Sequence, residues 1–365
     1  RICLHMARMQ LPPNDVLPEG LDIASPLLDD MLDMLKVYAP NVLEEAMPIL
    51  KQEGILVEAT QDYEVGEYSI PEEMLEVKRK DDGKVDILEQ GEHYVIANKP
   101  PSVVVHHSAW TGNRSDPKRR WKEPTPMLQR VRDATGKRVN PVHRLDRGAS
   151  GCLVFSFAQP GTEKTEKETC VVTSTLINSM QSEEATKTYI ALCDGNGSWN
   201  GKDFLEKGWF DLGLPVKDEN GKILEGASTD IRFIASKTLK PIDGDGNDDE
   251  RMEGRMISIV LARPNTGKWH QIRQHLSSGT IGHAILGDSS HGRSRTNRLW
   301  KKERHLLKER TCLHLAQVQL PPTEYTPSGV DVKCPLPDDF VKMLKEMPDL
   351  LEEARPHLLE EGIEI

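Results

Sequence analysis

The chain is organised around the stretch Asn140-Pro-Val-His-Arg-Leu-Asp-Arg-Gly-Ala-Ser-Gly151, which runs directly into the apolar segment Cys152-Leu-Val-Phe-Ser-Phe157. A short apolar run of this kind is typical of a buried strand, so Asp146 is expected on a loop at the edge of a sheet. Its neighbours His143, Arg144 and Arg147 favour the charged form of the carboxyl group. An ionised carboxylate on a rigid loop can act as a nucleophile or a base; the alternative is a surface salt bridge without a chemical role.

The composition indicates a globular protein with reduced thiols. The 365 residues are enough for two or three domains, and no run approaches the roughly 18 apolar residues of a membrane helix. The six cysteines lie far apart without a Cys-x-x-Cys pair, which argues against a zinc site and a disulfide framework. We therefore expect an intracellular protein with no membrane contact, in the cytoplasm or an organelle. Because the chain starts at Arg1 rather than Met, a targeting segment ahead of it would be out of view.

The net charge of −11 conceals a strong asymmetry along the chain. Residues 91–309 contain 34 Lys and Arg against 27 Asp and Glu, a net charge of +7. The remaining residues contain 13 against 31, a net charge of −18. The middle segment is therefore a candidate for binding a polyanion, and the flanking segments are acidic.

Two basic segments in this middle region contain aromatic residues. Residues 111–124 carry five Lys and Arg beside Trp110 and Trp121, and residues 293–304 form a second basic strip around Trp300. This pattern suits nucleic acid, because cations neutralise phosphates and aromatic rings stack on bases; the alternative is a solvated charged surface. Between two predicted strands, the acidic residues 239–253 predict a long hairpin turn rather than a calcium loop, since the twelfth-position glutamate is missing.

The two ends of the chain repeat each other. The segment Arg1-Ile-Cys-Leu-His-Met-Ala-Arg-Met-Gln-Leu-Pro-Pro13 matches Arg310-Thr-Cys-Leu-His-Leu-Ala-Gln-Val-Gln-Leu-Pro-Pro322 at an offset of 309, and the match continues to the C-terminus with one gap. Residues 1–57 are therefore expected to duplicate 310–365, as the end of a preceding tandem domain of the same kind in the same polypeptide. The alternative is a tail duplicated within one domain. In the tandem hypothesis, the sheet to which the strand predicted at 3–11 belongs is not part of this chain. The strand then needs another sheet edge or another strand as its hydrogen-bonding partner.

The repeat and the charge pattern together predict the domain organisation. An acidic linker is expected at 58–90, a catalytic domain at 91–320 and an acidic helical tail at 321–365. In the tail, Asp338 and Asp339 would open an amphipathic helix that buries Phe340, because acidic residues suit a helix N-terminus.

Two further segments carry candidate functional residues. The alternation in Thr188-Tyr-Ile-Ala-Leu192 predicts a strand, on which Tyr189 is most simply a packed core residue. A strand is also predicted at 255–262 and a short helix at 269–278. Arg273 would lie at the border of the buried face of this helix and need a carboxylate partner, for which Asp146 is the candidate.

Taken together, these segments resemble the RluA-type pseudouridine synthases. The motifs are Lys99-Pro-Pro-Ser with His106 downstream, His143-Arg-Leu-Asp-Arg-Gly-Ala-Ser-Gly151, Lys187-Thr-Tyr189, and Thr266-Gly-Lys-Trp-His-Gln-Ile-Arg273 with Gly287-Asp288 and His291-Gly292. They occur in family order over residues 88–320, and the Asn297-containing extension is most similar to the tRNA-modifying TruC branch. The chain departs from the family pattern at Gly148-Ala149 and at Trp269, neither of which is a catalytic position.

The resemblance implies a reaction and a set of site residues. Asp146 would attack the target nucleotide as the glycosidic bond to N1 breaks, and the base would rejoin through C5, so that uridine becomes pseudouridine without cofactor or metal. Tyr189 matches a tyrosine that stacks on the base and is a candidate for proton transfer, and Arg273 matches the arginine paired with the aspartate. Arg144 matches a residue that can fill the space left by a flipped base. The substrate-binding residues implied by the motifs are His143, Arg144, Arg147, Lys99, His106, His270, Gln271, Asp288 and His291.

We therefore expect an α+β pseudouridine synthase fold with a mixed, mainly antiparallel sheet and flanking helices. The expected substrate is structured RNA, tRNA ahead of ribosomal RNA. One alternative is a non-catalytic RNA-binding or RNA-chaperone module on the same fold. Another is a metal hydrolase that uses His270, His275, His283 and His291, although their spacing matches no known ligand pattern.

Overall fold

The structure is a computed structural model, which describes part of the chain. The described residues are 8–11, 21–24, 48, 83–106, 124–158, 166–205, 207–239, 255–277, 279–303, 306–307 and 309–365. They divide into two compact units, Arg1–Val77 and Lys78–Ile365. The predicted basic loop at 111–124 and the predicted acidic turn at 239–253 lie almost entirely outside the described residues.

The described part of Lys78–Ile365 is built on one mixed sheet of eleven strands. The strand order is β10-β13-β14-β7-β16-β6-β4-β3, with β15 paired to β7, β17 to β16 and β5 to β6. Only the β16–β6 pair is parallel among these pairs, which confirms the predicted mixed, mainly antiparallel α+β fold. The strands are β3 (Asp86–Gln90), β4 (Tyr94–Lys99), β5 (Val139–Pro141), β6 (Ser150–Phe157), β7 (Thr186–Asp194), β10 (Phe210–Asp211), β13 (Thr229–Thr238), β14 (Met256–Pro264), β15 (Ala284–Ile285), β16 (Leu313–Leu320) and β17 (Val330–Lys333).

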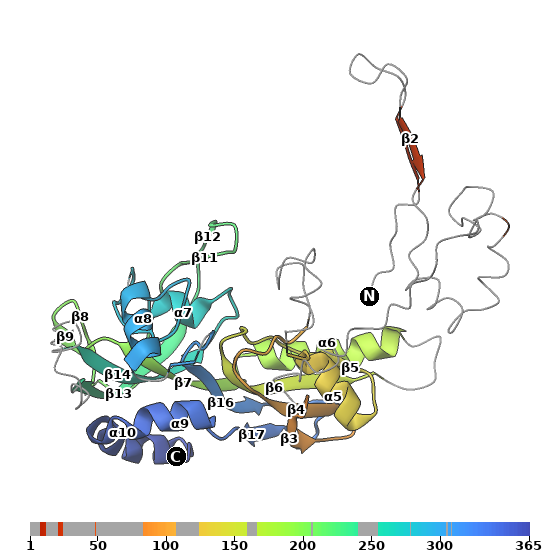
Figure 1. The fold of residues 1–365 in the computed structure, drawn as a ribbon. Helices are drawn as coiled ribbons and strands as arrows, with labels where there is room; N and C mark the ends of the chain where they lie inside the picture. Colours follow the sequence, from red (N-terminus) through yellow and green to blue (C-terminus); the bar gives the residue numbers. More distant parts are fainter. Residues whose placement is uncertain are drawn as a thin grey trace, which may run out of the picture. The chain divides into compact units, whose positions relative to one another are not determined.

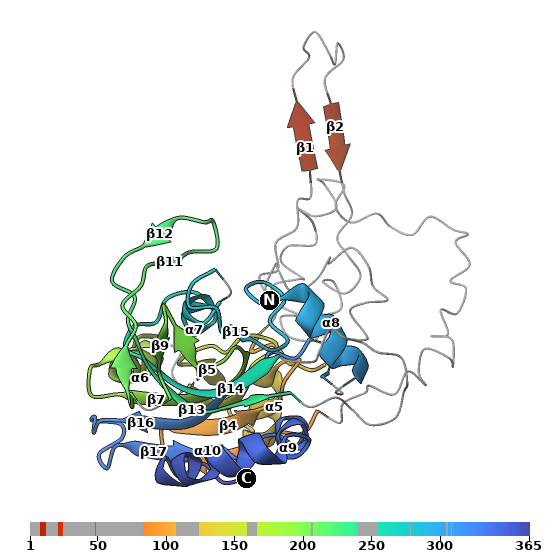
Figure 2. The same cartoon turned by 90° about the vertical axis from the view of Figure 1, so that its left-hand side faces the viewer.

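Helices cover both faces of this sheet. Helices α7 and α8 lie over the face opposite to α9 and α10 (Figures 1 and 2). Two small hairpins, β8–β9 (Ser198–Trp199 and Lys202–Asp203) and β11–β12 (Val216–Lys217 and Ile223–Leu224), extend from the unit. Across the described residues, no helix combines the length and apolar character needed to span a bilayer. The helices are α5 (Met127–Thr135), α6 (Glu166–Gln181), α7 (Gln271–His275), α8 (Ser294–Glu303), α9 (Asp338–Lys345) and α10 (Pro348–Glu360).

Strand β6 is buried along its whole length, as the apolar run predicts. Its two serines are satisfied by side chains, Ser150 by His314 at 2.9 Å and Ser156 by Thr173 at 2.8 Å. The strand belongs to a core that β4, α5 and α6 share, while β13, β14 and α8 to α10 pack around a second core. Tyr189 on β7 packs against both cores, so the predicted site residues lie where the two halves of the sheet meet.

The structure places the domain boundaries differently from the sequence prediction. Strand β3 (Asp86–Gln90) lies within the predicted 58–90 linker, yet it pairs with β4 as part of the main sheet. The predicted separate tail at 321–365 packs on the same sheet, and its apolar residues Phe340, Leu344 and Leu358 are buried in the second core. Most acidic residues of this segment are exposed, because the amphipathic helices turn their apolar faces inward, but Asp339 pairs with the buried Arg310 at 2.8 Å. The compact unit Lys78–Ile365 therefore includes both segments.

In unit Arg1–Val77 the structure describes one hairpin, formed by β1 (Arg8–Leu11) and β2 (Leu21–Ala24). The register pairs Arg8 with Ala24 and Leu11 with Leu21. Adding 309 to each number gives the register of β16 with β17, in which Gln317 pairs with Lys333 and Leu320 with Val330. The predicted N-terminal strand therefore pairs with β2. The two copies of the repeat form separate hairpins that have the same register. The tandem domain itself stays a prediction.

His314 makes the fold sensitive to acid. Its Nε2 donates to the carbonyl of Cys334 at 3.2 Å and its Nδ1 accepts from Ser150, so the neutral ring is fully hydrogen-bonded. Burial lowers the pKa of His314 from 6.5 to about 3. Between these values the unfolded chain binds a proton that the folded chain does not, so stability falls as the pH drops from 6.5 towards 3. We expect His314→Met to reduce the stability loss between pH 7 and pH 5 by about 2 kcal/mol, measured by denaturant unfolding at both pH values. An unchanged difference would contradict this assignment.

Candidate active site

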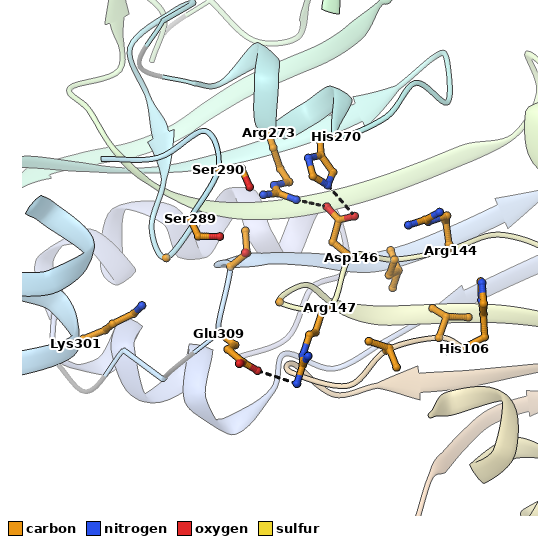
Figure 3. A pocket seen from close by; sticks show the side chains of 16 residues that line it. His106, Arg144, Asp146, Arg147, His270, Arg273, Ser289, Ser290, Lys301 and Glu309 are labelled. Carbon is orange, nitrogen blue, oxygen red and sulfur yellow. Dashed lines mark hydrogen bonds and ion pairs between the residues drawn. The ribbon is translucent and has the colours of Figure 1, made fainter. Parts of the chain in front are cut away.

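Asp146 lies in the loop between β5 and β6, at the wall of a cavity of about 520 Å³. Its side chain is 25% exposed, enough to meet a ligand in the cavity. Figure 3 shows the carboxylate pointing towards Arg273 and His270, with Lys301 and Arg144 on opposite sides of it. The sequence-predicted residues that line this cavity are Asp146, Arg273, His106, Arg144, Arg147 and His270.

The Asp146 loop is fixed from behind by two buried basic side chains. Lys99 Nζ is fully buried and donates to the carbonyls of Arg147 at 3.1 Å and Ala149 at 2.6 Å, while burial lowers the pKa of Lys99 well below its usual value. Arg310 donates to the carbonyl of Gly148 at 3.0 Å. A Cβ on Gly148 would come within 2.7 Å of the Glu309 carbonyl, so this position needs glycine. Lys99, expected to bind substrate, therefore supports the loop instead and cannot reach the cavity.

Arg273 on α7 binds two carboxylates at once. Its Nη1 donates to Asp146 Oδ2 at 2.7 Å, as the sequence predicts, while Nε and Nη2 donate to the two oxygens of Asp288, each at 2.7 Å. Burial opposes the charge of Arg273, but the hydrogen bonds and charges of Asp288 and Asp146 outweigh it and raise the pKa. Because Asp288 holds Nε and Nη2, the guanidinium plane is fixed and Nη1 points in a defined direction. Asp146 is thus held by a rigid cation.

Asp288 is a supporting residue rather than the predicted substrate contact, because it is only 1% exposed. Its Oδ1 also accepts the backbone N–H groups of Ser290 at 2.8 Å and His291 at 2.9 Å. Burial opposes ionisation, but the hydrogen bond and charge of Arg273 and these N–H groups lower the pKa of Asp288 overall. Gly287 precedes it with a φ of 81°, and a Cβ there would lie 1.9 Å from the carbonyl oxygen of Arg310.

His270 faces the second oxygen of Asp146. Its Nε2 lies 3.5 Å from Asp146 Oδ1, and its Nδ1 lies 3.1 Å from Nε2 of His291. The Trp269 ring stacks on His270 with 3.8 Å between centroids, which explains how a large residue is accommodated at this position. Burial lowers the pKa of His270 to about 4 and also lowers that of His291. Both rings are therefore neutral at pH 7, and His291 contacts the ring that faces Asp146.

Tyr189 on β7 does not line the cavity. Burial and the charge of Asp146 raise the pKa of its phenol, which keeps it protonated and disfavours a role as a base. Proximity to Asp146 agrees with the predicted place of Tyr189 in the site, whereas its role in stacking or proton transfer stays a prediction.

Two other predicted substrate contacts are satisfied within the fold. His143 accepts the backbone N–H of Val154 at 3.1 Å, and burial lowers its pKa to about 4. Gln271 is 4% exposed and donates to the carbonyl of Ser228 and to Thr229, each at 2.8 Å. Neither residue lines the cavity.

The cavity also contains residues that motif reasoning missed. Glu309 forms an ion pair with Arg147 at 3.1 Å, and Ser289, Ser290 and Lys301 line the wall next to Asp288 and α8. Lys301 belongs to the predicted basic strip, which was the available sequence signal. Glu309 had none, because a lone acidic residue ahead of a strand is common.

The four histidines considered for a metal site do not converge. His270 and His291 face each other, whereas His275 contacts Leu214 and Thr229, and His283 contacts Gly197 and Ile281. In the described residues no group of three or more His, Cys, Asp or Glu side chains is arranged to hold a metal ion.

Comparison with known proteins gives consistent matches. Residues 93–278 match the family model described as RNA pseudouridylate synthase. A tRNA pseudouridine synthase C from Pectobacterium carotovorum subsp. carotovorum is 30% identical over 244 residues, which cover 65% of this chain but only 55% of that relative. A tRNA pseudouridine synthase C from Vibrio cholerae is 26% identical over 276 residues, covering 72% and 95% of the two chains. The solved structure of human RNA Pseudouridylate Synthase Domain Containing 4 aligns with a TM-score of 0.47 and 19% identity over 72% of this chain and 93% of that one. The family match gives no support to the upstream synthase domain expected from the repeat.

Proposed function

Because the chain belongs to the RNA pseudouridylate synthase family, we propose that it isomerises uridine to pseudouridine in RNA, with Asp146 as the attacking carboxylate. The observation that carries this proposal is the position of Asp146, which is accessible from the cavity and held at 2.7 Å by Arg273. The supporting shell of Lys99, Asp288 and Arg310 fixes that position before substrate arrives, which is what catalysis by orientation requires.

In the proposed reaction, an Asp146 oxygen attacks the nucleotide as the bond between C1′ and N1 breaks. The detached uracil turns within the cavity, and a bond forms between C1′ and C5 while the bond from the nucleotide to the Asp146 oxygen breaks and the carboxylate is regenerated. C5 then loses its proton and N1 gains one, so that substrate and product are isomers and no co-substrate is consumed. Arg273 holds Oδ2 of Asp146 throughout, while Oδ1 faces the neutral His270. Arginine is suited to this role because its guanidinium remains charged and directional inside a partly buried site.

The RNA must present a uridine outside its stack to reach Asp146, at a cost of about a few kcal/mol. Arg144 is exposed at the cavity wall and is our candidate to fill the vacated space, since guanidinium planes stack on bases. We propose tRNA as the substrate ahead of ribosomal RNA, because several similar relatives are named tRNA pseudouridine synthase C.

The test is pseudouridine mapping on total RNA from cells that lack this gene, after treatment with wild-type protein or with Asp146→Ala. We expect one or a few sites that appear only with wild-type protein, and their location names the RNA. If wild-type protein binds RNA but produces no new site in any RNA class, the proposed activity is wrong and the RNA-binding module is favoured.

A further inference from the structure

Helix α8 has a strongly cationic outer face. The exposed side chains on this helix include Arg295, Arg298, Lys301 and Lys302, which span about 120° of the helical circumference at 100° per residue. In the described part of the chain, no carboxylate forms an ion pair with any of the four. Charges left unneutralised on one helix face favour a polyanionic partner.

The same helix reaches the site already described. Lys301 lines the cavity that contains Asp146, so the last turn of α8 lies at the cavity wall (Figure 3). From Arg295 to Lys302 the helix rises about 10 Å. A polynucleotide with one nucleotide in the cavity and its strand leaving past Lys301 places its neighbouring phosphates close to this face.

The inner face of α8 contacts the residues that hold Asp146. Asn297 is 7% exposed; its Oδ1 accepts the N–H of Gly287 at 2.8 Å, and its Nδ2 donates to the carbonyl of Asp288 at 2.7 Å. Asp288 in turn holds Arg273, and Arg273 holds Asp146. Thr296, one residue earlier, donates to the buried Asp194 at 2.9 Å and fixes the helix to the end of β7. Three successive contacts, from Asn297 through Asp288 and Arg273, thus connect α8 to the attacking carboxylate.

We propose that α8 is a substrate-docking helix: its outer face binds the RNA backbone beside the target uridine, and Asn297 on its inner face positions Asp146 through Asp288 and Arg273. This proposal rests on the proposed synthase function for its substrate and adds a specific binding surface and a positioning residue. A single helix then sets both where the RNA lies and how the carboxylate is held.

The two faces predict different kinetic effects. The outer-face variant Arg295→Gln/Arg298→Gln/Lys302→Gln is expected to raise KM on the order of tenfold to a hundredfold and to change kcat by less than about twofold. Its tRNA affinity should depend less on salt, with the slope of log K against log salt weaker by about two to three. Asn297→Ala is expected to lower kcat on the order of tenfold to a hundredfold with unchanged tRNA affinity, because a small misplacement of Asp146 slows the chemical step.

Both quantities are measured with unfractionated tRNA from cells lacking this gene, using 5-tritiated uridine release for kcat and KM and a fluorescent tRNA for binding. The matched control is Lys342→Gln/Lys345→Gln/Arg355→Gln, which removes the same charge from exposed positions on α9 and α10, across the sheet from α8. Asn297→Asp keeps the acceptor for Gly287 but loses the donor to the Asp288 carbonyl, so its kcat should stay as low as that of Asn297→Ala. Retained tRNA affinity shows that the Asn297 variants are folded, and the nearly unchanged kcat shows the same for the outer-face variant.

Unchanged KM and salt slope in the outer-face variant, or equal changes in the control, would overturn the docking surface. A wild-type kcat for Asn297→Ala would overturn the positioning role. Failure of the proposed function looks different: wild-type protein would release no tritium, while the binding measurements would still decide whether α8 holds RNA.

Discussion

Asp146→Asn is expected to reduce the single-turnover rate of pseudouridine formation on the order of 10⁴-fold or more, as the removal of a catalytic nucleophile does in other enzymes. The amide has nearly the shape of the carboxylate but is a poor nucleophile. Arg273 keeps its bidentate contact with Asp288 in this variant, so the fold should change in stability by no more than about 1 kcal/mol. The lower rate should therefore come from the chemical step and not from unfolding. RNA affinity measured in parallel should stay within about threefold of the wild-type value.

The cavity supplies a matched control for this substitution. Glu309 lines the same cavity and pairs with Arg147 at 3.1 Å, but it lies outside the Arg273 contacts. Glu309→Gln removes the same charge from the same cavity and should lower the rate by less than about tenfold. Comparable losses from Asp146→Asn and Glu309→Gln would mean that charge in the cavity, rather than a nucleophile at Asp146, determines the rate.

The parts of the site that the sequence predicted correctly are those with a local signal. The apolar run after Gly151 predicted β6, and hence a loop that presents Asp146 at the sheet edge. The position of Arg273 on a short helix predicted a buried cation in need of a carboxylate, and the ion pair with Asp146 is present. Both deductions need only periodicity and the cost of burying charge.

The parts that were not predictable depend on which way a polar side chain points. Lys99, Gln271 and Asp288 stand in motifs beside the site, yet each is buried and satisfied by the fold. The second carboxylate of Arg273 could not be anticipated, because Asp288 is reached through a turn that only tertiary packing defines. The predicted helix at 269–278 is shortened to α7 (Gln271–His275), since His270 adopts a left-handed conformation with φ of 50°. That conformation directs His270 into the cavity instead of continuing the helix.

The predicted domain boundaries rested on acidic composition, which does not show where an apolar face packs. The amphipathic helix predicted after Asp338 and Asp339 is confirmed as α9, but its apolar face packs on the main sheet. In α9, Asp338 and Asp339 are in the first turn while Phe340 and Leu344 are buried, so an acidic segment closes the core. Strand β3 is short and half-buried at the sheet edge, where alternation is weak.

Arg273→Met is expected to damage both stability and catalysis. Asp288 would remain 1% exposed without its cation, and an unpaired buried charge of this kind typically costs about 3–5 kcal/mol. Asp146 would lose its 2.7 Å partner, which should slow the chemical step on the order of 10²-fold to 10³-fold. Denaturant unfolding and single-turnover rates at a temperature where the variant is folded measure the two effects separately.

The double variant Arg273→Met/Asp288→Asn distinguishes the two roles of the arginine. Asparagine removes the stranded charge and keeps an oxygen that can accept the N–H groups of Ser290 and His291, so about half or more of the lost stability should return. Activity should not return, because nothing replaces the guanidinium at Asp146. Recovery of activity along with stability would show that Arg273 acts only as a structural ion pair. Recovery of stability alone would show that the Asp288–Arg273 pair stabilises the fold, whereas the Arg273–Asp146 contact serves the reaction.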